Sequence, residues 1–582
     1  MRSDNILTMF LGNKKRHSRD IDPDEIFLDS SNLPQFDTHQ FEGRLEQPIP
    51  KLSLALLWGF FVLVIVLFSI RLGNLEIARG ESFARIAENN RLERVPIFAE
   101  RGALFDRNGT PLAWNEPLLG EEFAARVYNK MRGLAHVLGY VTYPARDTKG
   151  MYYKESFSGM DGVERAYNDV LGGTNGTLLI ETDAQGGERS THRESLAENG
   201  ENLVLSIDAR IEEALYTRIE NLARDVGFTG GAGVLMDIDT GDIIALVSYP
   251  EYDAGVLANG TPHDVETLLA DPRTPLLNRA ISGVYTPGSI VKPFLALAAL
   301  QEQLISPDEK ILSTGSIAIP HPYLVGEESV FLDWKAHGWV SMREALAVSS
   351  NVYFYEIGGG LPQGGGNEER VGLGIGKIKS YMNLLGFEKR TGVDLFGEEI
   401  GVIPDPAWKE KIFHDVWRLG DTYNTSIGQY GFQVTPLQAA RAVAAIANGG
   451  TLPIPRIVTR IFSDDETNIG GKVLPPKRTQ LPIDSLHYAV VREGMRLGVL
   501  EGTAQGLNIP VVEVAAKTGT AQVGTVKKIV HSWVTGFFPY EHPRYSFAIV
   551  MERGPSDNLI GALYVLRGLL EWMAVETPEY LK

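Results

Sequence analysis

The sequence contains no cysteine, so it can form no disulfide bond, thiol nucleophile or cysteine-ligated zinc site. Basic residues are also scarce: 55 lysines and arginines stand against 73 aspartates and glutamates, giving a net charge of −18. Nucleic-acid-binding proteins need basic patches, so this balance argues against nucleic acid as a partner. The chain does have 44% hydrophobic residues in 582, enough to bury the cores of several domains.

Long hydrophobic runs are rare too, and only one of them reaches membrane-spanning length without a charge. Residues 52–70 read LSLALLWGFFVLVIVLFSI, with Lys51 and Arg71 as flanks. A helix of this run reaches about 28 Å, close to the thickness of a bilayer core. A signal peptide would be shorter, nearer the start and followed by a small-residue cleavage site. We therefore expect a single transmembrane helix.

The residues before this run predict its orientation. Basic residues cluster at Lys14–Arg16 and Arg19, and basic residues favour the cytoplasmic side, whereas acidic residues count for little. The segment is polar and has few core-forming side chains. We therefore expect residues 1–51 to be a disordered cytoplasmic tail and everything after the span to lie outside the cytoplasm.

Residues 71–202 show an extended, mixed pattern. Helical character covers residues 76–94, while residues 101–113 predict two short strands joined by a tight turn at Asn108-Gly109. Another strand is expected at 177–181. These signals predict an elongated, β-rich domain.

A change of composition near residue 200 predicts the start of a second domain, residues 203–582. A strand is expected at 203–207, a helix capped by Asp208 at 208–225, and a hairpin at 233–238 with 242–247. A largely helical middle is expected at 287–450, strands at 514–517, 532–538 and 546–551, and a last helix at 558–573. The last helix carries an apolar stripe, which we interpret as core packing. This order favours an antiparallel sheet surrounded by helices, an α+β domain.

Ser289 and Lys292 stand three residues apart at a predicted helix start, in the sequence Pro287-Gly-Ser-Ile-Val-Lys-Pro. A serine hydroxyl needs a base to take its proton, and residues i and i+3 share one face of a helix. Apolar surroundings should lower the pKa of Lys292 toward that of a general base. A capping serine before a surface lysine gives the same motif, so this segment alone leaves both interpretations open.

A second polar motif, Ser349-Ser350-Asn351, interrupts an apolar run. It forms either a buried capping network or a site in which Ser349 relays a proton and Asn351 holds substrate and lysine. The same pattern occurs as Ser30-Ser31-Asn32 in the predicted tail. The motif therefore carries information only together with its neighbours.

A third motif, Lys517-Thr518-Gly519-Thr520, is predicted to end a strand at 511–516, and an extended peptide can pair with the open edge of that strand. The lysine and the first threonine can bind a terminal carboxylate, and the glycine leaves room for the substrate. The backbone N–H groups of the second threonine and of Ser289 can form an oxyanion hole.

In this order the three motifs resemble those of the penicillin-binding proteins, and residues 52 to 575 are similar to the class B enzymes, the monofunctional D,D-transpeptidases. Residues 101–113 resemble the pedestal signature of that family, and residues 162–171, 241–250 and 401–404 are also similar to it. Residues 417–429, followed by 435–438, resemble its elongation subtype, penicillin-binding protein 2.

The resemblance implies a fold and a reaction. The fold is a transpeptidase domain like that of penicillin-binding proteins and serine β-lactamases at 203–582, on a pedestal or dimerisation-like domain at 71–202. The reaction cross-links peptidoglycan stem peptides through an acyl-enzyme on Ser289, with Lys292 as its base, during elongation. D,D-carboxypeptidation is expected as a side activity, and β-lactams are expected to acylate the same serine.

The resemblance also implies a location and a partner. We expect a bacterial inner or plasma membrane, a periplasmic catalytic domain, and a multi-span glycan polymerase of the shape, elongation, division and sporulation family as partner. Only 22 residues separate Ala113 from His136, so the head region of the subtype is reduced. Some members bind zinc near the active site through a cysteine. Asp333 and His337 lie in a similar setting, but without a cysteine we expect no metal and no cofactor.

Other functions remain to be weighed. A penicillin-binding scaffold that has lost catalysis should lack one of Ser289, Lys292 or Lys517, and all three are present. A class A enzyme needs a glycosyltransferase domain, a β-lactamase needs a deacylation base and no anchor, and a β-lactam sensor needs several spans. A division-type transpeptidase shares every motif, so elongation and division are not separated by sequence.

Overall fold

The first helix of the described chain has no buried side chain. α1 (Lys51–Gly73) continues into a π-helical turn, η3 (Asn74–Ala78). The helix is apolar on every side, which is typical of a membrane span, because a surface helix keeps a polar face. Among the described residues it is the one helix long and apolar enough to cross a membrane. The computed structural model describes residues 50–81, 92–148, 150–182, 188–321, 323–361, 370–463, 471–524, 528–558 and 560–582.

The predicted helix at 76–94 is wrong in its last residues. The π turn ends at Ala78, residues 82–91 lie outside the described ones, and β1 (Leu92–Ile97) is a strand. β1 pairs along its whole length with β9 (Gly176–Thr182), the strand expected at 177–181. Pairing between distant segments thus overrides a local helical preference. Residues up to Asn90 form one unit, and the rest of the chain forms a second.

Short strands build the region before residue 203. β1, β9 and β10 (Glu188–Ser195) form one antiparallel sheet. A second sheet has the order β20-β19-β11-β2-β3-β4 and contains the hairpin predicted at 101–113. Its strands are β2 (Leu104–Phe105), β3 (Pro111–Pro117), β4 (Ala124–Tyr128), β11 (Asn202–Leu205), β19 (Val458–Phe462) and β20 (Lys472–Val473). Smaller elements are α3 (Ala135–Leu138), β5 (Val141–Thr142), β6 (Ala145–Arg146), β7 (Tyr152–Lys154), β8 (Ser158–Gly159), α4 (Gly162–Ala166) and α5 (Asn168–Gly172).

This six-stranded sheet joins segments that are distant in sequence. β11 runs parallel to β2, with Leu203 opposite Leu104, and antiparallel to β19, with Asn202 opposite Phe462. Strands from before and after the predicted boundary at residue 202 therefore share one hydrogen-bonded sheet. The boundaries 1–51, 52–70, 71–202 and 203–582 stay predictions.

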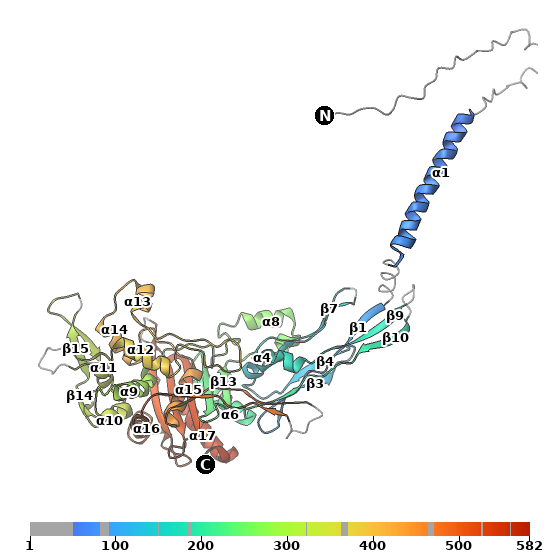
Figure 1. Ribbon diagram of the computed structural model, residues 1–582. Coiled ribbons are helices and arrows are strands. Elements are labelled where there is room, and N and C mark those ends of the chain that lie inside the picture. The colour runs from blue at the N-terminus through green and yellow to red at the C-terminus, as the bar shows by residue number, and fades with distance from the viewer. Residues whose placement is uncertain are drawn as a thin grey trace, which may run out of the picture. The chain divides into compact units, whose positions relative to one another are not determined.

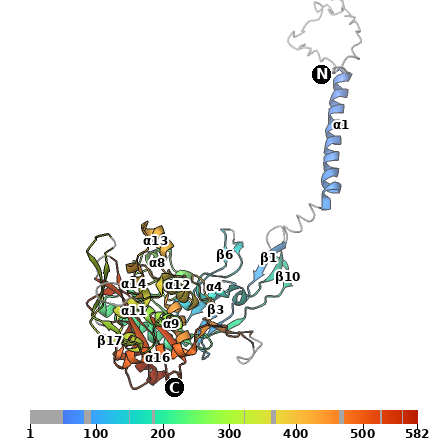
Figure 2. The same ribbon diagram turned by 60° about the vertical axis from the view of Figure 1, so that its left-hand side comes forward.

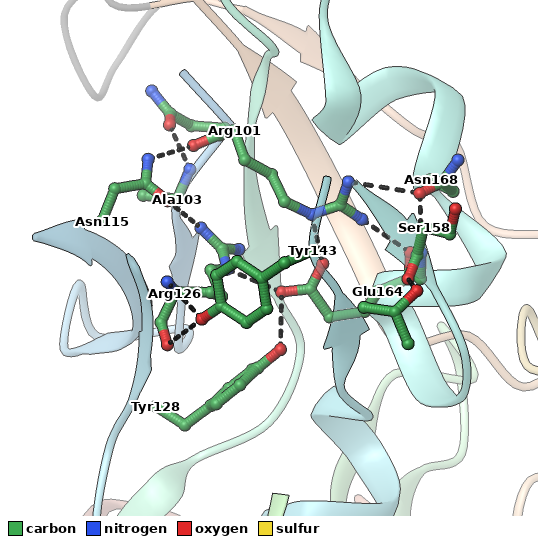
Figure 3. Close-up of polar contacts among 12 residues, drawn as sticks. Arg101, Ala103, Asn115, Arg126, Tyr128, Tyr143, Ser158, Glu164 and Asn168 are labelled. Atoms are coloured by element: carbon green, nitrogen blue, oxygen red, sulfur yellow. Dashed lines mark hydrogen bonds and ion pairs between the residues drawn. The ribbon is translucent and has the colours of Figure 1, made fainter. Parts of the chain in front are cut away.

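A buried ion-pair network lies where residues 101–113 and residues 162–171 meet (Figure 3). The Glu164 carboxylate of α4 accepts hydrogen bonds from Arg101 Nε at 2.6 Å and Arg126 Nε at 2.7 Å, and all three side chains are 1% exposed or less. Burial alone would raise the pKa of Glu164, but the charges of Arg126 and Arg101 bring it below its usual value. Removing either partner would leave a buried charge uncompensated, so the signature is a packing element of this region.

The second predicted domain is organised by a five-stranded antiparallel sheet in the order β13-β12-β24-β23-β22. The predicted hairpin around Gly241 is its β12–β13 pair, and the predicted cap Asp208 accepts a hydrogen bond from Arg210 N at the start of α6 (Ala209–Val226). The strands are β12 (Gly230–Asp237), β13 (Ile243–Tyr249), β22 (Ala515–Val523), β23 (Ile529–Phe538) and β24 (Tyr545–Pro555).

Helices cover both faces of this sheet (Figure 1). Leu235 and Ile549 pack with α6 and α17 (Ala562–Glu576) in one apolar core, while Val234 and Val550 point to the core on the other face. The apolar stripe of the last helix is buried in the first of these cores, as predicted. The α+β fold class is confirmed.

The middle of the domain is less helical than predicted. Two small antiparallel sheets interrupt residues 287–450, one of β14 (Ile311–Ser313) with β17 (Gly338–Val340), the other of β15 (Ser316–Pro320) with β16 (Glu328–Leu332). Both sheets consist of short strands that pair with other segments, and the local sequence does not predict such pairing. The helices around them gather in one part of the domain (Figures 1 and 2). They are α9 (Lys292–Gln301), α10 (Met342–Val348), α11 (Asn351–Gly359), α12 (Gly374–Leu384), α13 (Pro406–Phe413), α14 (Leu419–Ser426), α15 (Pro436–Ala447) and α16 (Ser485–Leu500).

Candidate active site

Ser289 lies in a single 3₁₀ turn, η4 (Gly288–Val291), directly before α9. The predicted first turn of an α-helix is therefore a tighter turn, in which the side chains of residues i and i+3 eclipse each other. Ser289 and Lys292 have this spacing. Gly288 has φ +57 and donates its N–H to Gly428 O at 2.9 Å, and a Cβ on it would lie 3.0 Å from Thr520 O. The glycine thus lets the turn lie against the third motif.

Lys292 is fully buried and joins the first motif to the second. Its Nζ lies 2.7 Å from Ser349 O, 2.7 Å from Asn351 Oδ1 and 3.3 Å from Ser349 Oγ. The carbonyl and amide oxygens can only accept hydrogen bonds, whereas the serine hydroxyl can also donate one. A neutral lysine can therefore keep all three contacts by donating to the two oxygens and accepting from the hydroxyl.

The second motif is the junction of two helices. Ser349 ends α10 in the left-handed region, with φ 60, and Ser350 caps α11 by accepting a hydrogen bond from Tyr353 N. This conformation costs a residue with a side chain about 1 kcal/mol or more, and it turns the Ser349 carbonyl and hydroxyl toward Lys292. The predicted capping interpretation is confirmed, and the capped junction brings Ser349 and Asn351 to Lys292. The roles of Ser349 as a proton relay and of Asn351 in holding substrate stay predictions.

Lys292 of the first motif and Lys517 of the third are both buried, and the charge of Lys517 acts on Lys292. Burial lowers the pKa of Lys292 well below its usual value, the positive charge of Lys517 lowers it further, and the charge of Asp333 raises it. Burial also lowers the pKa of Lys517, to about 7. A lysine with a lowered pKa gives up its proton more readily, which is what acid–base chemistry on a serine requires.

The third motif lies inside its strand and does not end it. β22 starts at Ala515, so the predicted strand at 511–516 is placed too early. The pairing of β22 with β23, from Ala515 opposite Phe537 to Val523 opposite Ile529, determines these bounds. β22 is an edge strand of the five-stranded sheet, so the expectation of an open edge beside the motif is met.

Gly519 packs closely against the first motif. A Cβ built on it would lie 2.9 Å from Pro287 O and 2.9 Å from Ile290 Cγ2, so its bare side faces the turn that carries Ser289. Lys517 precedes Gly519 by two residues and therefore lies on the same, buried face of β22. Its Nζ donates a hydrogen bond to Thr518 O at 2.9 Å. Thr518 points the other way, and its hydroxyl donates to Thr503 Oγ1 at 2.7 Å.

The neighbourhood also contains Asp333, which sequence reasoning considered only in connection with zinc. Its side chain is 0% exposed, and its carboxylate accepts hydrogen bonds from the second motif at the N-terminus of α11. It follows β16 directly, a strand whose existence the sequence did not reveal. No sequence signal other than the local Asp-Trp-Lys setting pointed to it.

The residues present do not fit a zinc ion. Asp333 and His337, with Oδ1 and Nε2 3.7 Å apart, bring two donor side chains together, and among the described residues no three His, Cys, Asp or Glu side chains gather in a metal-binding arrangement. The Asp333 oxygens already accept hydrogen bonds from the backbone and from serine hydroxyls. We therefore derive no step through a metal.

Comparison with known proteins agrees with this arrangement. The model of the penicillin-binding protein transpeptidase domain matches residues 231–562, and that of the penicillin-binding protein dimerisation domain matches residues 121–205. Peptidoglycan D,D-transpeptidase MrdA of Escherichia coli (strain K12) is 28% identical over 616 residues, which cover 88% of this chain and 92% of MrdA.

Solved structures show the same relationship. Pseudomonas aeruginosa PBP2 in complex with WCK 5153 is 29% identical with a TM-score of 0.68, covering 84% of this chain and 98% of that one. A chain of a peptidoglycan synthase complex that coordinates polymerization and crosslinking is 25% identical with a TM-score of 0.66, covering 89% and 97%. Since the transpeptidase model spans more than half of the sequence, the chain belongs to the penicillin-binding proteins, as a class B member of the penicillin-binding protein 2 type.

Proposed function

We propose that the chain is an elongation-type peptidoglycan D,D-transpeptidase in which Ser289 is the nucleophile. The observation that carries this proposal is the environment of Lys292. Lys292 follows Ser289 by three residues, is fully buried and contacts Ser349 and Asn351. Its strongly lowered pKa suits it to act as a base.

The first half-reaction forms an ester. Neutral Lys292 Nζ takes the proton of Ser289 Oγ, and this oxygen attacks the carbonyl carbon of the penultimate D-alanine of a stem peptide. The backbone N–H groups of Ser289 and Thr520 are assigned to the negative oxygen that develops. As the C–N bond breaks, the departing D-alanine nitrogen receives a proton from Lys292 through the Ser349 hydroxyl, which leaves an acyl-enzyme.

The second half-reaction transfers the acyl group. The amine of another stem peptide gives a proton back through the same hydroxyl, attacks the ester carbonyl and forms the cross-link, and Ser289 regains its proton. Water in place of the amine gives the D,D-carboxypeptidase side activity. Which product dominates depends on which acceptor reaches the ester first.

The substrate peptide is assigned to the open edge of β22, where it can add as another strand. Lys517 supplies positive charge for the terminal carboxylate while it is protonated, and Asn351 supplies an amide for a substrate carbonyl. β-Lactams enter the same site, because their strained ring amide has the place of the cleaved peptide bond.

The membrane arrangement is also part of the proposal. α1 anchors the chain with residues 1–51 in the cytoplasm and residues 71–582 outside, in the periplasm. A monofunctional transpeptidase makes no glycan, and a solved relative belongs to a complex that coordinates polymerization and crosslinking. We assign this chain a multi-span glycan polymerase of the shape, elongation, division and sporulation family as its partner.

Intact-mass measurement after treatment with benzylpenicillin tests the nucleophile. The full chain in detergent should gain the mass of one penicillin, Ser289→Ala should gain none, and Ser306→Ala, which removes an exposed serine, should behave like the wild type. An unmodified wild type, or an adduct that survives Ser289→Ala, would refute the assignment. An adduct that disappears within seconds would indicate a β-lactamase.

A further inference from the structure

The carboxylate of Asp333 accepts hydrogen bonds from the second motif at the N-terminus of α11. Its Oδ2 accepts hydrogen bonds from Ser350 Oγ at 2.8 Å, Asn351 N at 2.8 Å, Val352 N at 3.0 Å and Ser313 Oγ at 3.1 Å. Its Oδ1 accepts from the backbone N–H of Trp334 at 2.9 Å. Five donors around one carboxylate that is 0% exposed make a closed cluster within the described residues.

These bonds orient the residues that hold Lys292. The first two N–H groups of α11 are those of Asn351 and Val352, and Asp333 accepts from both, which also places a negative charge at the positive end of the helix. The Asn351 side chain donates to Leu332 O at 3.3 Å, one residue before Asp333, and turns its Oδ1 toward Lys292 Nζ. A shift of Asp333 and the adjacent Leu332 would therefore move both the backbone and the side chain of Asn351.

The same carboxylate acts on Lys292 through its charge. Lys292 and Lys517 are both buried, and their positive charges oppose each other. Asp333 is the acidic group whose charge raises the pKa of Lys292, while Lys335 and His337 lie on the same loop, with His337 Nε2 3.7 Å from Asp333. The carboxylate thus limits how far burial and Lys517 lower the proton affinity of Lys292.

We propose that Asp333 is a positioning residue of the acyl-transfer site, which fixes Asn351 and the neighbouring Ser349 around Lys292 and places a negative charge near that lysine. It touches neither substrate nor Ser289 in this assignment. The inference rests on the proposed function, because it assumes that Lys292 works on Ser289.

The test compares acylation of the full chain by a fluorescent penicillin from pH 5.5 to 9 in wild type, Asp333→Asn and Asp308→Asn. Asp308 is a matched control, because its side chain is 88% exposed and pairs with Arg343 at the surface. Asp333→Asn should acylate about 100-fold more slowly at its best pH, since displacing a catalytic group by about 1 Å has this effect. Its acidic limb should move to lower pH, because Lys292 loses a neighbouring negative charge. Asp308→Asn should match the wild type.

A merely structural role gives a different result. Asp333→Asn would then label fewer molecules, but each at the wild-type rate and with an unshifted acidic limb, and this outcome overturns the inference. Equal rates in Asp333→Asn and wild type also overturn it. A wild type that is not acylated at all counts against the proposed function instead, so the two failures are distinguishable.

Ser313→Ala tests the proposal independently in case Asp333→Asn does not fold. It removes one donor to the carboxylate and keeps the charge. Acylation should fall about tenfold, the effect of losing one hydrogen bond to a charged group, while the acidic limb stays in place. A Ser313→Ala enzyme that acylates at the wild-type rate would contradict a positioning role for the cluster.

Discussion

At the scale of single residues, Lys292 shows how burial prepares a base. A solvated lysine is protonated at neutral pH and has no lone pair to offer. Here burial and Lys517 favour the neutral form, and the left-handed Ser349 brings a carbonyl and a hydroxyl to the same nitrogen. The hydroxyl is the one of these contacts that can donate to the neutral amine and accept from the protonated one, as the proposed proton relay requires.

We expect Lys292→Arg to lose acylation by about 10²–10⁴-fold, because arginine keeps the charge but has no accessible neutral form. In the wild type the acylation rate should rise with pH through the lowered pKa of Lys292. In the variant this rise should vanish. Stopped-flow acylation with a fluorescent penicillin measures both, and Lys335→Arg, an exchange at an exposed lysine, serves as the control. Near-normal acylation by Lys292→Arg would place the base elsewhere.

At the scale of elements, α6 contains a buried carboxyl group, that of Glu212, with few hydrogen bonds to offset the cost of burying its charge. Glu212 is fully buried, its Oε2 accepts a hydrogen bond from Leu246 N at 2.7 Å, and its Oε1 has no partner within the described structure. Burial raises the pKa of Glu212 to about 8, and the charge of Glu251 contributes in the same direction. The helix thus packs most stably with a protonated side chain at this position.

This raised pKa predicts how stability depends on pH. Glu212 binds its proton more tightly in the folded chain than in the unfolded one, so its contribution is complete below about pH 4.5 and is lost as the pH rises through about 8. Between these values the loss is about 1.4 kcal/mol for each pH unit. Glu212→Gln should remove this dependence and raise the melting temperature at pH 8.

Thermal unfolding of the full chain between pH 5 and 8.5 provides the measurement. Glu266→Gln neutralises an exposed glutamate of α8 (Pro262–Leu269) and should unfold in parallel with the wild type. If Glu212→Gln loses stability with pH as steeply as the wild type does, Glu212 is already ionised in the folded protein.

At the scale of the whole molecule, the six-stranded sheet is the feature that connects the two predicted outer domains. β2, β3 and β4 come from residues before 202, and β19 and β20 come from beyond residue 457. A hydrogen bond from Tyr167 OH to Asp394 Oδ2 at 2.8 Å adds a side-chain link between the same regions. Relative motion of the two regions would have to break these bonds, so we expect them to move as one body.

In the proposed complex with a glycan polymerase, we expect the span and residues 71–113 to supply most of the contact, because only 22 residues separate Ala113 from His136. Trp58 to Phe61 puts aromatic side chains and a glycine on α1, the kind of surface on which membrane helices pack. Exchanging residues 52–70 for an unrelated span should weaken co-purification with the polymerase and leave penicillin acylation intact.

A second chimera serves as the matched control, with Trp58–Phe61 restored within the foreign span. Recovery of co-purification would locate the contact on that short stretch. Co-purification that survives the full exchange would mean that the span is only an anchor and that the contact lies further along the chain.

Features encoded locally were predictable from the sequence alone. The span, the hairpin turn at Asn108-Gly109, the Asp208 cap and the order of the three motifs depend on residues that are close together in the chain. The structure contains each of these features, and the comparisons confirm the α+β penicillin-binding-protein fold that they suggested.

Only the tertiary structure decided features that depend on distant partners. β1 is a strand because β9 pairs with it, and β22 starts at Ala515 because its pairing with β23 starts there, opposite Phe537. Gly519 faces the turn of Ser289 because two segments more than 200 residues apart pack together. Asp333 shows the same limit, since its place under the second motif follows from β16. Local sequence carries turns, caps and periodicity, whereas pairing and burial depend on which segments meet.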